Sequence, residues 1–99
     1  MRAIVLIQLD KLRPALVLTR DIALPYLTKV TIAPITSTIR GLSTEVPLGP
    51  ANGLDHPCAA SCDNITTVPK DAITRQIGLL LDTDEPTLTN AINAAFDLR

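Results

Sequence analysis

The spacing of apolar residues changes once along the chain, near residue 84, and this change constrains the fold more than any other feature. Upstream of it, short aliphatic and β-branched runs of strand length are separated by turns rich in proline, glycine and charged residues. These runs cover residues 3–9, 15–19, 29–36, 44–48, 58–67 and 72–81. Such a pattern is typical of a small, curled antiparallel sheet or half-open barrel.

Downstream of residue 84, one segment has helical spacing. Its start is marked by Asp84 or Glu85 with Pro86, because carboxylates suit the first helical turn and proline tolerates the first helical position. Apolar residues at offsets 0, 3, 4, 7 and 8 then form one face: Leu88, Ala91, Ile92, Ala95 and Phe96. The sequence therefore predicts a mainly β (α+β) fold with a C-terminal α-helix.

Local features refine the predicted sheet. Residues 10–14 are short enough for a tight reversal, so the first two runs form a hairpin, and residues 21–28 are a connection. Pro34 lies within the third run and implies an edge strand or a bulge, because proline cannot donate to a strand ladder. Residues 68–71 are expected to turn between the last two strands.

The chain has 99 residues, which predicts a single domain over residues 1–99 and excludes barrel and doubly wound enzymes. Tyr26 and Phe96 are its only aromatic residues, so a base-stacking nucleic-acid platform is nearly excluded. The apolar runs are too short to span a bilayer, and no signal-peptide cleavage pattern follows the first one. We expect a cytoplasmic protein without a membrane anchor.

Charge is unevenly placed along the chain. Residues 1–41 hold six cations and two acids, a balance of +4, whereas residues 42–99 hold three cations and eight acids, a balance of -5. This split permits a local anion-binding face on a protein whose net charge is -1. The alternative is that the two halves interleave in space and cancel.

The four glycines stand alone, which excludes Gly-rich phosphate loops, and neither a nucleophile elbow nor a metalloprotease motif is present. His56, Cys58 and Cys62 form H-x-C-x3-C, whose side chains are of the types that bind zinc. On an extended strand, residues four apart lie about 13 Å from each other, so the spacing disfavours a shared metal or a disulfide. We expect no metal or cofactor, reduced thiols, a buried Cys62 and a solvated loop position for His56.

Two polar groups at the ends of predicted strands suit phosphate chemistry. Arg13 offers a planar fork of donors that matches phosphate oxygens. The hydroxyl run Thr36, Ser37 and Thr38 can add donors to the same oxygens. Taken alone, the residues leave open whether Arg13 is an ordinary surface cation and the hydroxyl run an ordinary turn.

Five segments, in this order and spacing, resemble the MazF/PemK toxin family. They are residues 13–19 (RPALVLT), 30–41 (VTIAPITSTIRG), 44–48 (TEVPL), 61–70 (SCDNITTVPK) and 77–78 (IG). The resemblance covers about residues 2 to 98 and includes the final helix. It implies a small SH3-like antiparallel β-barrel with helices, assembled as a homodimer.

The resemblance also implies a function. Members of this family are ribosome-independent, metal-independent endoribonucleases that cut single-stranded RNA at short sequences and are neutralised by a cognate, MazE-like antitoxin. Arg13 and Thr36 match the active-site arginine and threonine of the family, and Asp63 matches an aspartate proposed as the base in some members. A water or another group remains an alternative base. The expected RNA-binding residues are Arg20, Lys29, Ser37, Thr38 and Arg40.

The chain departs from the family pattern in three places. The arginine expected two positions before Asp63 is Ser61, the usual Gly-Glu-Ile-Trp opening is replaced by residues 2–6, and the long first loop is cut to residues 10–12. The acid–base pair and the RNA sequence of long-loop relatives therefore cannot be carried over. Two alternatives stay open: a non-enzymatic, gyrase-binding toxin of the same fold, like CcdB, and a catalytically inactive module that only binds its antitoxin.

Overall fold

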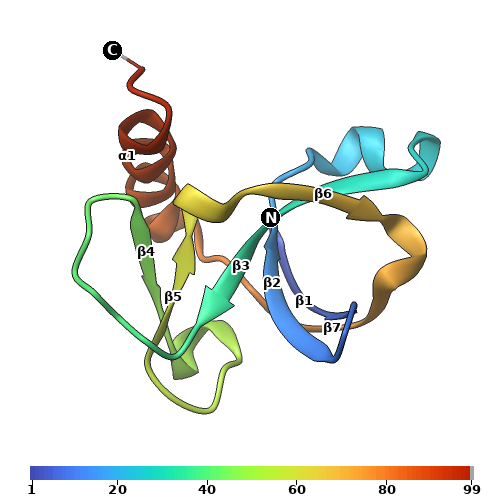
Figure 1. Ribbon diagram of the computed structural model, residues 1–99, viewed down its shortest axis with the longest axis horizontal. Helices are drawn as coiled ribbons and strands as arrows, with labels where there is room; N and C mark the ends of the chain where they lie inside the picture. Colours follow the sequence, from blue (N-terminus) through green and yellow to red (C-terminus); the bar gives the residue numbers. More distant parts are fainter. Residues whose placement is uncertain (99) are drawn as a thin grey trace.

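Seven strands and one α-helix make up the fold in the computed structural model, which describes residues 1–98 (Figure 1). The strands are β1 (Ala3–Gln8), β2 (Leu12–Val17), β3 (Lys29–Thr36), β4 (Glu45–Leu48), β5 (Cys58–Ser61), β6 (Thr66–Pro69) and β7 (Ile73–Leu79). The helix α1 spans Glu85–Ala95. Short 3-10 helices fill the connections: η1 (Asp21–Tyr26), η2 (Pro50–Asn52), η3 (Cys62–Asn64), η4 (Lys70–Ala72) and η5 (Asp82–Asp84).

All strand pairs are antiparallel, and β3 joins two groups of strands. On one side, the curled order β6-β3-β2-β1-β7 forms most of the sheet. On the other, the end of β3 pairs with β5, which pairs with β4. Figure 1 shows α1 beside β4 and β5, away from the β1–β2 hairpin. The predicted fold, a curled antiparallel sheet with a C-terminal helix, is confirmed.

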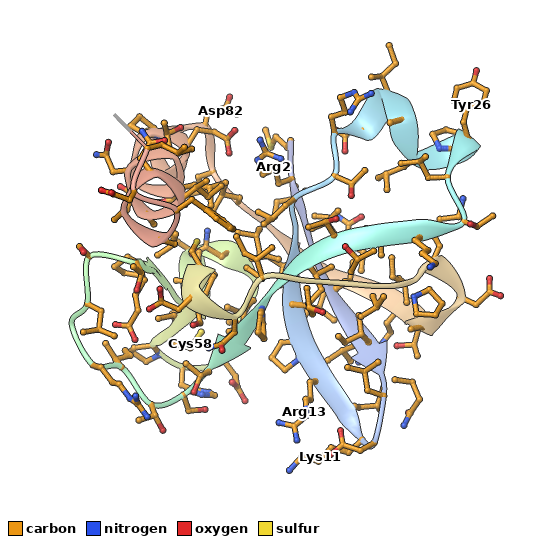
Figure 2. All side chains as sticks on the ribbon, turned by 45° about the horizontal axis from the view of Figure 1, so that its top comes forward. Arg2, Lys11, Arg13, Tyr26, Cys58 and Asp82 are labelled. Carbon is orange, nitrogen blue, oxygen red and sulfur yellow. The ribbon has the colours of Figure 1, made fainter. Side chains whose placement is uncertain are left out.

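Strand alternation divides the interior into two hydrophobic clusters. Residues Val30 and Ile32 of β3 point into the cluster enclosed by the curled sheet, whereas Ala33 and Ile35 point into the cluster under α1. The strands β1 and β2 divide their side chains in the same way, because successive residues of a strand face opposite sides. Aliphatic residues fill both clusters, as the low aromatic content requires, and the single tyrosine, Tyr26, is 85% exposed (Figure 2).

The helix begins at Glu85, as expected, and Leu88 and Ala91 bury its apolar face in the second cluster. Phe96, expected as the last residue of the apolar stripe, lies at the C-cap just after the helix ends and is 56% exposed. No helix within residues 1–98 is long and apolar enough to cross a membrane.

The structure corrects four details of the predicted strands. Residues 12–14 belong to β2, so the reversal after β1 is shorter than expected. Pro34 does not mark an edge: β3 is central, and Pro34 lies where its neighbour changes from β6 to β5. The predicted strand 58–67 is two strands separated by η3, because Cys62 turns into the core and its N–H donates to the Thr44 carbonyl at 3.0 Å. Val68 and Pro69 pair within β6 and do not form a turn.

Candidate active site

A groove of about 1280 Å³ is bordered by the β1–β2 hairpin, the end of β3 and the loop that precedes β5. Six of the eight predicted site residues line it: Arg13, Thr36, Ser37, Thr38, Arg40 and Asp63. The structure does not bring Arg20 and Lys29 to this groove. Arg20 lines a separate pocket of about 250 Å³ beside Met1 and Arg2, and Lys29 is exposed at the start of β3.

Arg13 lies on β2 opposite Ile7 of β1, near the tip of the hairpin (Figure 2). Its Nε and Nη2 groups donate to Asp10 Oδ1 and Oδ2 at 3.3 and 3.2 Å. These bonds lower the pKa of the Asp10 carboxyl and raise the pKa of the guanidinium. A guanidinium has five N–H donors. Because Asp10 holds only one edge of it, the remaining donors can bind a phosphate in the groove.

Thr36 ends β3, where the strand pairs with β5. Its partner in β5 is Ala59, and the preceding Ile35 is buried in the cluster under α1. The Thr36 hydroxyl oxygen accepts the Thr38 N–H at 3.1 Å. With the oxygen fixed by this bond, the hydroxyl hydrogen is free to donate to an anion.

The loop after β3 carries the other predicted donors to the same groove. Ser37, Thr38 and Arg40 are exposed, and the Arg40 and Leu42 N–H groups donate to the Glu45 carboxylate at 3.1–3.2 Å. This carboxylate at the start of β4 therefore shapes the loop that presents the Arg40 side chain.

Asp63 lies on η3 and faces the groove from the other side. Its Oδ2 accepts the Thr44 hydroxyl at 2.6 Å, which ties η3 to the residue before β4. The oxygen of Ser61, which stands where the family resemblance implied an arginine, accepts the Asn64 side-chain amide at 2.8 Å. The position two before Asp63 is thus the last residue of β5, and its side chain is bonded to η3.

His56 is the groove residue whose contacts sequence analysis missed. Its Nε2 lies 3.0 Å from Ser37 Oγ, and its Nδ1 is hydrogen-bonded to the Asp55 carboxylate. It is half-exposed in a loop, as expected, but the loop places it against the end of β3. The adjacent Asp55 was the one available signal, since a carboxylate beside a histidine can orient its ring.

Charges in the groove come from both halves of the sequence. Four cations line it, Lys11, Arg13, Arg40 and Arg75, against three acids, Glu45, Asp55 and Asp63, a balance of +1 with His56 neutral. The charges of the two halves of the chain therefore interleave in this groove and nearly cancel, which was the alternative to a basic face. Individual cations, and not a broad positive field, would have to hold a phosphate.

Both cysteines are buried free thiols. Burial is the main cause that raises the pKa of both thiols. The negative charge of Asp55 raises the pKa of Cys58 further, and that of Asp63 raises the pKa of Cys62 further. Within residues 1–98, no three His, Cys, Asp or Glu side chains are grouped so that they could hold a metal ion. Cys62 packs as the small buried hydrophobe that was predicted.

Residues 2–96 match the sequence model of a family described as a PemK-like, MazF-like toxin of type II toxin-antitoxin system. The chain belongs to this family. It is 56% identical over 98 residues to Endoribonuclease MazF3 of Mycobacterium tuberculosis, covering 99% of this chain and 95% of the relative. It is 35% identical over 86 residues to Probable endoribonuclease MazF5 of the same species, covering 86% and 79% of the two chains.

Solved structures agree with this assignment. Mycobacterium tuberculosis toxin MazF-mt6 superposes with a TM-score of 0.96 at 55% identity, covering 99% of each chain. An endoribonuclease in complex with its cognate antitoxin from a mycobacterial species has the same fold, with a TM-score of 0.86 at 22% identity over 98% of this chain and 93% of that one. The predicted MazF/PemK resemblance is confirmed, and endoribonuclease is the enzyme class of its relatives.

Proposed function

We propose that this chain is a sequence-specific, metal-independent and ribosome-independent endoribonuclease toxin that cuts single-stranded RNA in the cytoplasm, inhibits translation and growth, and is neutralised by a MazE-like antitoxin. The observation that carries this proposal is that Arg13 and Thr36, which are distant in the sequence, line the same groove. In this family, such a pair serves phosphate chemistry. The proposed active form is a homodimer.

The proposed reaction is attack of a ribose 2′-hydroxyl on the adjacent phosphate, which leaves a 2′,3′-cyclic phosphate and a 5′-hydroxyl end. Negative charge grows on the phosphate oxygens in the transition state, where fixed donors bind it more strongly than they bind the ground state. Arg13 supplies a permanent cation for this charge, and Thr36 supplies a hydroxyl held by the Thr38 N–H.

Substrate binding would use the exposed donors around this pair. Ser37, Thr38 and Arg40 are proposed to hold flanking phosphates, because they line the same groove. Contacts of RNA with Arg20 and Lys29 stay a prediction, and they require the strand to continue beyond the groove. Asp63 as proton acceptor also stays a prediction; its bond to Thr44 leaves its second carboxylate oxygen for that role.

The alternative is a gyrase-binding toxin of the CcdB type, and the inactive, antitoxin-binding module is a further one. Neither function needs an arginine and a threonine hydroxyl in the lining of one groove, so their shared position favours the nuclease.

The test is incubation of the purified protein with a long single-stranded RNA in EDTA, followed by mapping of the fragment ends. Discrete cuts with 5′-hydroxyl ends are expected, and the Arg13→Ala protein, prepared in parallel, controls for contaminating nucleases. Intact RNA in the presence of folded protein would overturn the proposal, and gyrase and antitoxin binding would then be measured.

A further inference from the structure

A carboxylate, an imidazole and a hydroxyl form a row on one wall of the groove. Asp55 bonds His56 Nδ1, and His56 Nε2 lies 3.0 Å from Ser37 Oγ. Ser37 directly follows Thr36, and all four residues line the groove together with Arg13. The imidazole is therefore next to the residues proposed to bind the reacting phosphate.

This row sets which ring nitrogen can accept a proton. An ionised carboxylate only accepts hydrogen bonds, so Nδ1 of the neutral ring carries the hydrogen that Asp55 binds. Nε2 is then an acceptor, and Ser37 is the donor to it. The lone pair of Nε2 thus already accepts a hydrogen bond from a hydroxyl group inside the groove.

The loop that carries Asp55 and His56 is anchored through Asn52. Asn52 is buried: its amide donates to the Leu79 carbonyl at 3.1 Å and to Asp84 at 3.0 Å, while its oxygen accepts the Gly49 N–H at 3.1 Å. A Cβ on Gly78 of β7 would lie 1.7 Å from the Asn52 carbonyl oxygen, so the loop and β7 are in backbone contact. The imidazole is exposed, but the loop that bears it is joined to β7 and η5 through Asn52.

Building on the function proposed above, we propose that His56 is the general base of RNA cleavage and that Asp55 positions it. The substrate 2′-hydroxyl replaces Ser37 as the donor to Nε2. As the O2′–P bond forms, the 2′ proton moves to Nε2; as the P–O5′ bond breaks, the leaving oxygen takes a proton from water. The resulting hydroxide takes the proton back from the imidazolium, so water is not consumed and the base is regenerated.

Chemistry and geometry favour His56 over Asp63 for this step. Imidazole is the side chain whose ordinary titration range covers neutral pH, which makes it a better proton acceptor there than a carboxylate. The Asp63 carboxylate is also engaged by Thr44 at 2.6 Å. Besides Asp55, the charged side chains that line the groove with His56 are Lys11, Arg13, Arg40, Glu45, Asp63 and Arg75.

The experiment is a single-turnover cleavage rate, measured from pH 5 to 9 on an oligonucleotide that contains a mapped cut site. For the unmodified protein the rate should rise with pH through the histidine range and then level off. His56→Gln keeps a polar side chain that cannot take up a proton; it should lose about 100-fold and this rise with it. His56→Ala should regain activity when free imidazole is added, which a merely structural role would not produce.

The controls separate this inference from the proposed function. Asp55→Asn should shift the pH profile, whereas Asp71→Asn, an exposed carboxylate outside the groove, should not. A folded His56→Gln protein with the unmodified rate and pH profile would overturn the role of His56, and loss of the rise in Asp63→Asn alone would assign the base to Asp63. In both cases, cleavage of RNA by the unmodified protein still supports the proposed nuclease function. If the unmodified protein does not cleave RNA, the proposed nuclease function itself is overturned.

Discussion

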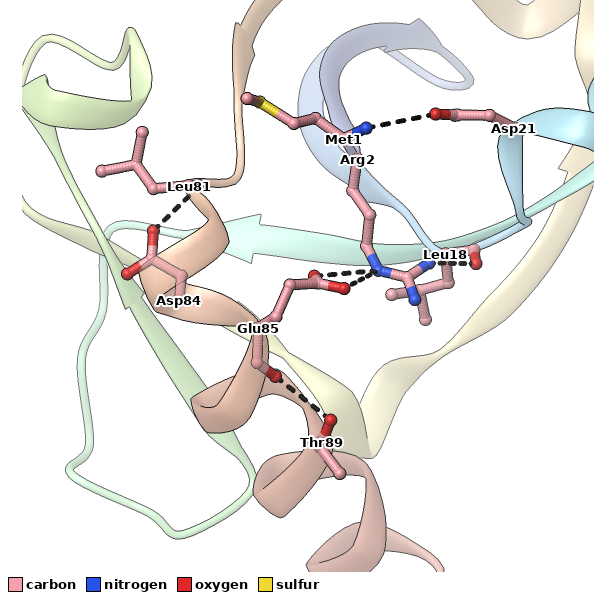
Figure 3. A network of polar contacts seen from close by, with 8 residues as sticks. All are labelled: Met1, Arg2, Leu18, Asp21, Leu81, Asp84, Glu85 and Thr89. Carbon is pink, nitrogen blue, oxygen red and sulfur yellow. Dashed lines mark hydrogen bonds and ion pairs between the residues drawn. The ribbon is translucent and has the colours of Figure 1, made fainter.

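Two arginines, Arg2 and Arg13, occupy opposite ends of the same hairpin and have contrasting surroundings. Arg2 donates to Glu85 at 3.1 Å and to the Leu18 carbonyl at 2.6 Å, so it joins the start of β1, the residue after β2 and the start of α1 (Figure 3). Within residues 1–98, the Arg13 side chain bonds only Asp10, three residues away at the exposed tip of the hairpin. A cation that links distant elements serves the fold, whereas one held on a single edge remains available to a ligand.

The comparison predicts that loss of Arg13 costs catalysis and not stability. Arg13→Ala should lower the cleavage rate by about 100-fold or more, the effect of removing a transition-state donor, while the melting temperature stays unchanged. Arg13→Lys, which keeps the charge without the fork, is the matched control and should recover only part of the rate. An unfolded Arg13→Ala protein, or one that cuts normally, would remove the distinction between the two arginines.

Arg2 should show the opposite behaviour. Arg2→Met keeps much of the apolar stem but leaves Glu85 and the Leu18 carbonyl without their donor, so the free energy of unfolding should fall by about 1–2 kcal/mol. Denaturant unfolding measures this change, and the cleavage rate per folded molecule should be unaltered. A reduced rate in fully folded protein would show that the N-terminal junction contributes to catalysis.

A smaller effect, on RNA binding, should distinguish the cations of the groove from cations elsewhere on the protein. Arg40→Ala is expected to weaken binding of all RNAs and to flatten the slope of log K against log salt by about 0.7. Arg20→Ala is the matched variant outside the groove, and binding titrations at several salt concentrations compare the two. An equal change in both slopes would mean that RNA extends to the Arg20 pocket; no change for Arg40 would remove it from the site.

The smallest expected effect is a local titration. Hydrogen bonds from Arg13 are the main cause that lowers the pKa of Asp10 below its ordinary value of 3.8. The pair is therefore complete at neutral pH and is lost only as pH falls through the lowered pKa of Asp10. NMR titration of the Asp10 carboxyl should give a higher pKa in Arg13→Ala. The same pKa in both proteins would mean that Asp10 does not hold the guanidinium in solution.

Much of the fold followed from local periodicity. The helix start at Glu85 and the strand β3 at residues 29–36 were predictable because each depends on residues close in the sequence. The errors at Pro34 and within residues 58–67 have another origin: strand partners change there, and partners come from distant segments. A proline is tolerated in central β3 at the point where one neighbour ends and the next begins.

The site was predictable to a different extent. The chemistry of their side chains singled out Arg13 and Thr36 for phosphate binding, the family resemblance gave roles to both and to Asp63, and all three line the groove. Arg20 and Lys29 were expected to hold flanking phosphates as cations, but the positions of cations along a sequence do not specify which of them share a face of the fold. His56 was missed because its partner Ser37 is 19 residues away, beyond any local pattern.

By itself, the sequence determined the alternation of short strands, the final amphipathic helix and the family to which the chain belongs, since these depend on local spacing and ordered motifs. Only the tertiary structure decided which cations share a groove, that Arg2 is a structural link, and that Asp55, His56 and Ser37 form a row. The physical reason is that these contacts join segments whose proximity is set by strand pairing and packing, and not by their positions along the chain.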